Sequence, residues 1–218
     1  MADNNMISKR KEAFSRVDLY PVTCQRLSAG RSNFEVLEAV LNGGARIIQL
    51  REPDLSDRAL YEMALDFRRI TTEAGALLII NDRVDIALAV DADGVHLGQD
   101  DLPLSTARKL APELLLGVST HSVDDASAAQ DQGADYINVG PVFPTETKDG
   151  LHRFLGPEAV AGIGGQVGIP FTVMGGINES NIDEVVSAGA QKVAVVTAIT
   201  RADNMEEAVR NLRKRITG

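Results

Sequence analysis

Cysteine is nearly missing from this sequence, since Cys24 is the only one among 218 residues. An internal disulfide is therefore excluded, as is a metal site built from several cysteines, and Cys24 is expected to be a small buried strand residue. Long apolar runs are also missing: none reaches the ~20 residues that span a bilayer, and the N-terminus lacks the apolar core of a secretory signal. The sequence therefore predicts a cytoplasmic protein with no membrane partner.

Positive charge is in short supply as well. Lysine and arginine number 22 against 31 aspartates and glutamates, which gives a formal net charge of −9 and a pI of about 4.8. This balance opposes broad attraction to nucleic acid or to an anionic membrane, so neither is expected as a partner. An anionic ligand must then be held locally, by a few cations, by backbone amides or by a bound metal ion.

What the sequence does contain is a regular alternation of short apolar runs with longer amphipathic segments. Its length, with 44% hydrophobic and 24% charged residues, is typical of one globular domain. The apolar runs mostly lack polar alternation, as expected of buried parallel strands. We expect eight strands, at residues 18–24, 45–52, 76–82, 94–98, 114–120, 136–142, 171–177 and 192–199.

The segments between the runs have helical periodicity. In residues 57–75, Leu60, Met63, Ala64 and Phe67 form one apolar stripe. The stretches NGGARIIQL, DADGVHLG, QGADYINVG and SAGAQKVAVV repeat one junction, in which a small-residue helix end with a left-handed glycine stop leads into a strand. Each stretch is therefore interpreted as the start of a new strand and helix unit.

These units predict a protein of the α/β class with a (β/α)8 TIM barrel over residues 16–218. Even spacing, and the absence of a GxGxxG motif at a strand end, favour this closed barrel over the alternative, an open doubly wound sheet. Residues 1–15 are predicted to form a polar N-terminal extension, either frayed or folded as a short lid helix.

Candidate site residues follow from this fold, because the active site of a β/α barrel lies at the C-terminal ends of its strands. Asp82 and Asp101 fall in neighbouring loops there, and two carboxylates with open positions suit a magnesium ion that also binds phosphate oxygens. The alternative for Asp82 is that it only caps a helix starting at Arg83. Of the histidines, His96 is interpreted as a satisfied interior group and His121 as the only candidate proton carrier.

Two further loops have residues that suit a phosphate. The loop GPVFPTETKDG offers the hydroxyls of Thr145 and Thr147 and the cation of Lys148, although an ordinary polar surface loop is the alternative. In MGGINESN, Gly176 permits close backbone approach, and a helix beginning at Asn178 would present N-terminal amides. The alternative there is a tight turn with packing glycines.

The segments QLRE, NDRVDIALA, ADGVHLGQDD, LGVSTHS, GADYINVGPVFPTETK and GGI together resemble the thiamine phosphate synthase family, from about Leu19 to Ile199. The resemblance implies a transferase with Mg²⁺ as its cofactor. Its reaction joins hydroxymethylpyrimidine diphosphate to a thiazole phosphate and gives thiamine phosphate and diphosphate. The phosphorylated pyrimidine and thiazole would thus be its small-molecule partners, and the sequence is compatible with a homo-oligomer.

The resemblance also implies a role for each matching position. The residues implied to hold the pyrimidine diphosphate are Gln49, Arg51, Asn81, Ser119 and Lys148, with Arg51, Lys148 and Ser119 as the catalytic group. The metal ligands would be Asp82 and Asp101. The residues implied to hold the thiazole phosphate are Thr145, Thr147, Gly176, Val196 and Thr197.

The sequence departs from the family pattern at two positions. Pro53 stands where the family usually has a lysine, so one diphosphate cation is missing, and Thr197 stands where serine is common. Two other functions remain as alternatives: a thiazole tautomerase-like isomerase that uses His121 as its acid and base, and a catalytically idle barrel that binds a ligand. An isomerase would have no evident use for Asp82, Asp101 and Lys148, which favours the synthase.

Overall fold

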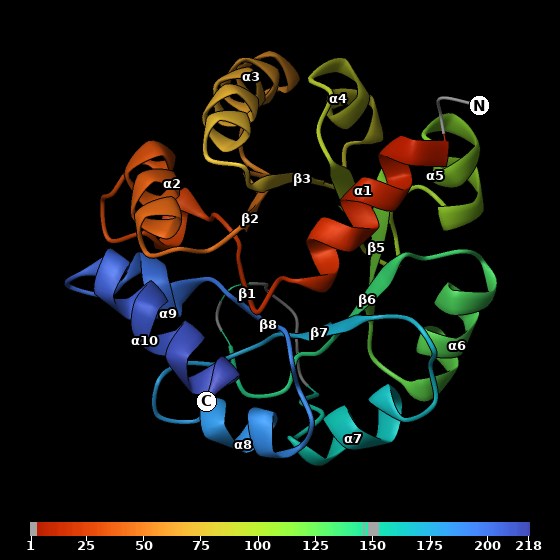
Figure 1. The fold of residues 1–218 in the computed structure, drawn as a ribbon, viewed down its shortest axis with the longest axis vertical. Helices are drawn as coiled ribbons and strands as arrows, with labels where there is room; N and C mark the ends of the chain where they lie inside the picture. Colours follow the sequence, from red (N-terminus) through yellow and green to blue (C-terminus); the bar gives the residue numbers. More distant parts are fainter. Residues whose placement is uncertain (1–3, 146, 148–152) are drawn as a thin grey trace.

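The structure is a computed structural model that describes residues 4–145, 147 and 153–218. Eight parallel strands form one sheet in the order β1-β8-β7-β6-β5-β4-β3-β2. The two ends of this order meet where Val22 bridges Gln49 and the Thr23 amide donates to the Gln49 carbonyl at 2.9 Å. The prediction of a closed barrel is confirmed, and the open doubly wound sheet is excluded (Figure 1).

Every strand lies inside one of the predicted apolar runs and is shorter than that run. The strands are β1 Leu19–Pro21, β2 Ile47–Leu50, β3 Leu77–Asn81, β4 Gly94–Leu97, β5 Leu115–Thr120, β6 Tyr136–Val139, β7 Phe171–Val173 and β8 Val193–Val195. The predicted strand ends therefore extended too far, and in one run the extra residues include part of a helix. Cys24 is buried but lies beyond β1, directly before the 3₁₀ turn η1 Gln25–Leu27. The last run overlaps the short helix α9 Thr197–Thr200, since a short apolar run does not distinguish strand from helix.

The helices form a ring outside the strands (Figure 1). The predicted stripe on α3 is confirmed, because Leu60, Ala64 and Phe67 are buried against the sheet. Within the described part of the chain, every helix is too short or too polar to cross a bilayer. The ring is made of α2 Asn33–Asn42, α3 Asp57–Glu73, α4 Val84–Ala89, α5 Leu104–Leu110, α6 Val123–Asp131, α7 Glu158–Gly164, α8 Ile182–Ser187 and α10 Met205–Thr217, with α9 between β8 and α10.

The predicted left-handed glycine before a strand is confirmed at three of the four repeated junctions, by Gly44, Gly133 and Gly189. Before β4 the prediction was wrong, because the left-handed residue is Asp91 and Gly94 is already the first residue of the strand.

Acidic side chains stabilise two of these junctions. Before β4, the Asp93 carboxylate accepts a hydrogen bond from the Leu78 amide of β3 at 2.9 Å. Before β6, the Asp135 carboxylate accepts one from the Leu116 amide of β5 at 2.8 Å and pairs with Arg108. An acidic residue at each of these two junctions thus ties the strand before it to the strand that follows.

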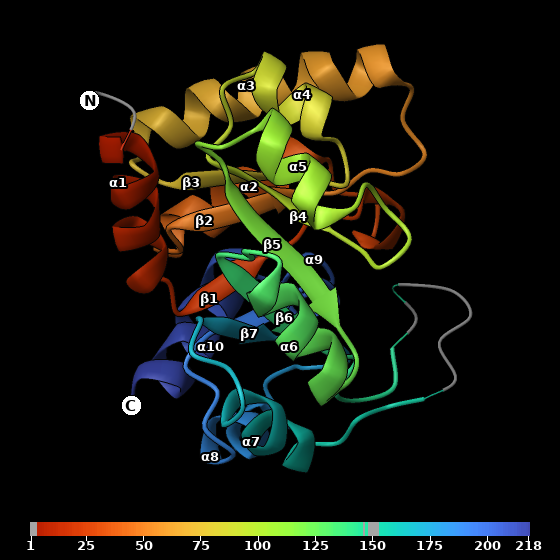
Figure 2. The ribbon, with the colours of Figure 1, turned by 90° about the vertical axis from the view of Figure 1, so that its right-hand side faces the viewer.

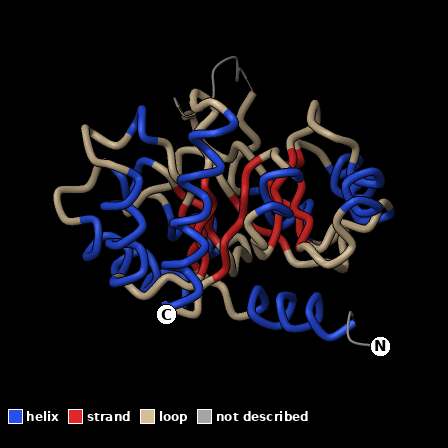
Figure 3. Tube along the Cα trace, turned by 90° about the horizontal axis from the view of Figure 1, so that it is seen from above, coloured by secondary structure: helices blue, strands red, loops and turns tan. Residues whose placement is uncertain are grey.

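The described part of the N-terminal extension folds into a helix, α1 Asn4–Ser15. It crosses the end of the barrel at which the strands begin, as Figures 2 and 3 show. The buried Arg10 side chain donates to the carbonyls of Ala92 and Glu113, at 3.0 and 2.8 Å, directly before β4 and β5. Phe14 enters the barrel and packs against the ring of Tyr136 at a centroid distance of 4.4 Å. This helix therefore closes one end of the barrel and leaves the other end open.

Candidate active site

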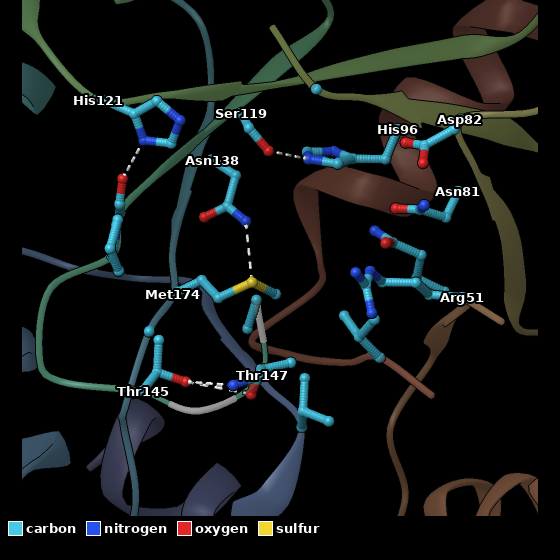
Figure 4. A pocket seen from close by; sticks show the side chains of 18 of the residues that line it. Arg51, Asn81, Asp82, His96, Ser119, His121, Asn138, Thr145, Thr147 and Met174 are labelled. Carbon is cyan, nitrogen blue, oxygen red and sulfur yellow. Dashed lines mark hydrogen bonds between the residues drawn. The ribbon is translucent and has the colours of Figure 1, made fainter. Parts of the chain in front are cut away.

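A cavity of about 390 Å³ lies at the carboxyl ends of the strands. Figure 4 shows Arg51, Asn81 and Asp82 together on one side of it and Thr145 and Thr147 on another. Lys148 lies outside the described residues. All the other predicted site residues line the cavity, namely Gln49, Arg51, Asn81, Asp82, Asp101, Ser119, Thr145, Thr147, Gly176, Val196 and Thr197.

Arg51 follows β2 and is fixed through its backbone. Its amide donates to the Thr23 hydroxyl at 2.9 Å, and that hydroxyl donates to the Arg51 carbonyl at 3.3 Å. The guanidinium Nη1 is buried without a hydrogen-bond partner among the described residues. Arg51 is also the sole lysine or arginine in the described cavity lining, and Pro53 is exposed and outside that lining. A buried cationic N–H with no partner is costly, so this position favours an anionic ligand.

Asp82 and Asp101 are held by local backbone geometry. Asp82 has a φ of 61°, in the left-handed region, and its amide donates to the His96 carbonyl at 2.8 Å. Helix α4 begins at Val84 with Arg83 as its N-cap residue, so Asp82 is not the helix cap. The Asp101 carboxylate accepts a hydrogen bond from the Gly98 amide at 2.6 Å. Strained backbone at a site-lining carboxylate is typical of functional residues.

The two carboxylates fit a magnesium ion that shares a phosphate ligand. The described residues contain no cluster of three or more histidine, cysteine or acidic side chains that would form a complete metal cage. Magnesium commonly uses only one or two carboxylates and takes its other oxygens from phosphate and water. The oxygen donors of Asp82 and Asp101, in the same cavity as Arg51, have the chemistry of that kind of site.

The loops after β6 and β7 approach each other closely in the cavity wall. The Thr145 hydroxyl lies 3.1 Å from the Thr147 hydroxyl and accepts from the Thr147 amide at 3.3 Å. A Cβ on Gly175, whose φ is +106°, would meet the Pro141 Cα at 2.6 Å. A Cβ on Gly176 would collide with the Pro144 carbonyl oxygen. Glycine is therefore required for these loops to lie side by side.

The helix expected to begin at Asn178 begins instead at Ile182, so that prediction was wrong. The physical reason is that two asparagine side chains accept hydrogen bonds from backbone amides that the first helical turn would otherwise contain. The Asn178 amide oxygen accepts from the Ser180 amide at 2.8 Å, and the Asn181 amide oxygen accepts from the Asn178 amide at 2.8 Å. Asparagine turns of this kind replace the first helical turn.

His96 is buried, as expected, and it connects two parts of the site. Its Nδ1 lies 3.2 Å from the Tyr136 hydroxyl. Its Nε2 lies 3.0 Å from the Ser119 hydroxyl (Figure 4). Burial lowers the pKa of His96 to about 4, and the nearby Asp101 charge opposes that shift. The ring is thus neutral at neutral pH, with one donor and one acceptor nitrogen.

Two more polar side chains, His121 and Asn138, line the cavity. His121 Nδ1 donates to the Gly140 carbonyl. Asn138 is buried on β6, its side-chain nitrogen lies 3.5 Å from the Met174 sulfur, and its Oδ1 has no partner in the described structure. The sequence reasoning missed Asn138, although a polar residue inside the apolar run of β6 was a usable signal.

The His96 ring should make stability depend on pH. Its folded pKa of about 4 lies below the ordinary value of 6.5, so the unfolded state binds more protons between these two values. Its contribution is therefore present above pH 6.5 and lost as the pH falls towards 4. A shift of this size corresponds to ~3 kcal/mol. Urea unfolding at pH 7 and pH 4.5 should show a loss of that order in the wild type that is absent in His96→Asn. Equal losses in the two proteins would contradict the neutral buried ring.

Comparison with known proteins gives one consistent family. The family described as Thiamine monophosphate synthase matches residues 19–199. The thiamine-phosphate synthase of Chloroflexus aurantiacus is 49% identical over 195 residues, which cover 89% of this chain and 90% of that protein. The thiamine-phosphate synthase of Moorella thermoacetica is 45% identical over 201 residues, or 92% of this chain and 96% of that protein. The solved thiamine phosphate pyrophosphorylase from Pyrococcus furiosus has a TM-score of 0.86 at 38% identity, and the match covers 96% of this chain and 98% of that chain.

Proposed function

Because the chain belongs to the thiamine monophosphate synthase family and is a transferase, we propose that its cavity joins hydroxymethylpyrimidine diphosphate to a thiazole phosphate, which gives thiamine phosphate and diphosphate. The observation that carries the assignment of this reaction to the cavity is the buried, unpartnered Nη1 of Arg51 among the described residues. That nitrogen shares the cavity with the carboxylates of Asp82 and Asp101. One cation and two hard oxygen donors suit a diphosphate that binds together with a divalent metal ion.

The pyrimidine diphosphate is assigned to the side of the cavity formed by β2 to β5. Arg51 and Ser119 donate to the diphosphate oxygens, and Gln49 and Asn81 contact the rest of this substrate. These side chains lie on or directly after β2, β3 and β5, within a run of four adjacent strands, and they line the same cavity, which supports a single binding site. Lys148 is proposed as the second cation, from the loop after β6, by its place in the family motif.

Asp82 and Asp101 would hold the magnesium ion of this reaction. When bound, magnesium neutralises negative charge on the diphosphate oxygens and so makes diphosphate a better leaving group. The Gly98 amide, which donates to Asp101, keeps that carboxylate turned towards its own loop. The left-handed backbone at Asp82 sets the direction of the other carboxylate.

The thiazole phosphate is assigned to the opposite side of the cavity. Thr147 supplies a hydroxyl donor, and Thr145 orients it by donating its own proton to the Thr147 hydroxyl. The close approach of the two loops brings the Gly176 backbone to the same wall. Val196 precedes α9 and Thr197 begins it, and the first amides of a helix have no partners within the helix. This combination of hydroxyl and amide donors, without a carboxylate, suits a phosphate monoester.

The chemistry needs position and charge stabilisation rather than a protein nucleophile. The bond between the pyrimidine methylene carbon and the diphosphate oxygen breaks, and its electron pair leaves with diphosphate. The thiazole nitrogen then gives its lone pair to that carbon. Arg51 stabilises the charge that develops on the leaving oxygens, and the two walls of the cavity orient the reactants. Val22, Met174 and Ala194 form an apolar part of the lining that limits the access of water to the reactive carbon.

We place this reaction in the cytoplasm. Both substrates carry phosphate charges, and moving charged groups through an apolar layer is very costly. An enzyme that uses them therefore works best in the compartment in which they are made.

The proposed function is tested by adding both substrates and magnesium to the purified protein and measuring thiamine phosphate. Product formation is the expected result, whereas its absence would favour an idle barrel. His121→Ala should retain most of this activity, because a thiazole nitrogen needs no general base. A tautomerase would instead lose ~10²-fold or more of its isomerase activity in that variant. A collapse of condensation in His121→Ala would contradict the mechanism.

A further inference from the structure

A chain of buried hydrogen bonds runs through the barrel interior between Gln49 and Ser119. The Gln49 side-chain nitrogen lies 3.0 Å from the Tyr20 hydroxyl, which lies 2.9 Å from the Tyr136 hydroxyl. The Tyr136 hydroxyl lies 3.2 Å from His96 Nδ1, and His96 Nε2 lies 3.0 Å from the Ser119 hydroxyl. The chain thus connects β2 with β5 through side chains of β1, β6 and β4.

The interior of the barrel is arranged to hold this chain. Tyr20 and Tyr136 are fully buried, and burial raises the pKa of both phenols, so both keep their protons. Gly117 pairs with Tyr136 across β5 and β6, and a Cβ at position 117 would collide with the Tyr136 ring. Phe14 of α1 packs against the same ring, with the ring centroids 4.4 Å apart. The phenol is therefore held in one position from two sides.

The direction of each hydrogen bond follows from counting protons. Gln49 donates an amide N–H to Tyr20, so Tyr20 gives its single proton to Tyr136, and Tyr136 gives its proton to His96 Nδ1. A neutral imidazole that accepts at Nδ1 donates at Nε2, so His96 donates to the Ser119 oxygen. The Ser119 hydroxyl proton then remains for a ligand, and Gln49 keeps its amide oxygen for a ligand.

We propose that Tyr20, Tyr136 and His96 are positioning residues that couple the two ends of this chain, so that Gln49 offers an acceptor to the substrate while Ser119 offers a donor. This inference rests on the proposed function, because the matching ligand is an aminopyrimidine diphosphate. Its amino group donates to the Gln49 oxygen, and an anionic oxygen accepts from Ser119. Reversing either end would require every link to reverse, since hydrogen bonds in a chain polarise one another.

The coupling is tested by kcat/KM for the pyrimidine diphosphate in Gln49→Ala, Ser119→Ala and the double variant. Without Gln49, the direction of the hydrogen bond at Ser119 is no longer fixed. Replacing Ser119 should then cause a smaller further loss of kcat/KM. The fold-loss of kcat/KM in the double variant should be about tenfold smaller than the product of the fold-losses in the two single variants. When Tyr136→Phe is present in every variant, the chain is broken. The loss of kcat/KM from Gln49→Ala and Ser119→Ala together should then equal the product of their separate losses. Thr71→Val removes a buried hydroxyl that donates to backbone carbonyls of α3, and it should leave the coupling unchanged.

A second readout does not depend on turnover. Nitrogen-15 NMR of labelled histidine should show the His96 ring as the Nε2–H tautomer in the wild type, and Tyr136→Phe should abolish this single preference. The inference would be overturned if the losses of kcat/KM from Gln49→Ala and Ser119→Ala were independent while Tyr136 is intact. An Nδ1–H tautomer of His96 in the wild type would also overturn it. If the wild type makes no thiamine phosphate, the proposed function fails while the tautomer measurement still decides the direction of the chain. If it makes product and the losses are independent, only the coupling fails.

Discussion

Replacing Arg51 by alanine is expected to lower kcat/KM for thiamine phosphate formation by roughly 10²- to 10³-fold, the usual effect of removing one preorganised donor to developing charge. The described cavity lining holds no other lysine or arginine, and Pro53 supplies no charge from the same loop. The loss of Arg51 therefore has no substitute among the described residues. Steady-state kinetics with varied pyrimidine diphosphate measure the effect.

Two matched variants make this prediction specific. The kcat/KM of Arg51→Lys should lie between the values of the wild type and Arg51→Ala, because lysine keeps the charge but lacks the planar guanidinium group that binds two oxygens. Arg46→Ala changes the net charge by the same amount at the other end of β2, where Arg46 is exposed, and should leave turnover unchanged. Similar losses for Arg46→Ala and Arg51→Ala would show that overall charge, rather than this guanidinium, matters.

Replacing Asp82 or Asp101 by asparagine is expected to lower turnover by about 10²-fold and to raise the magnesium concentration needed for activity, because a neutral amide is a poorer ligand for a hard dication. Asparagine is the informative substitution at both positions. It tolerates the left-handed backbone of Asp82, and it keeps an oxygen that can accept from the Gly98 amide at position 101. Kinetics over a magnesium titration give both quantities.

A control separates the metal role from a general effect of acidic charge at this rim. Asp124 is exposed in the first turn of α6, beyond the carboxyl end of β5, and it does not line the cavity. Asp124→Asn should leave the magnesium dependence unchanged. Unaltered activity of Asp82→Asn and Asp101→Asn at limiting magnesium would show that these carboxylates do not hold the metal ion.

The fold was largely predictable because its signals are local. Runs such as ALLIIND lack polar alternation, and strands buried on both faces have this composition. The element ends were less predictable. Val196 and Thr197 continue the apolar run of β8, yet the backbone turns into α9 there. The competition between a strand and a short helix is decided by tertiary packing, which the run does not encode.

The location of the candidate site was predictable because a barrel brings the carboxyl ends of all its strands to one rim. The contacts between side chains below that rim were not predictable from the sequence. Tyr20 and Tyr136 are 116 residues apart, and each reads as an ordinary aromatic residue in an apolar strand, so the sequence does not indicate that their hydroxyls meet. The left-handed backbone of Asp82 likewise depends on the hydrogen bond between its amide and His96.

A crystal structure of the protein with thiamine phosphate, diphosphate and magnesium tests the central claim most directly, since it locates both halves of the reaction at once. The account predicts the diphosphate within hydrogen-bonding distance of Arg51, with the metal ion between that diphosphate and the carboxylates of Asp82 and Asp101. It predicts the phosphate of thiamine phosphate on Thr147 and the backbone of Gly176. A diphosphate bound away from Arg51, or a phosphate outside the walls formed by the loops after β6 and β7, would contradict it.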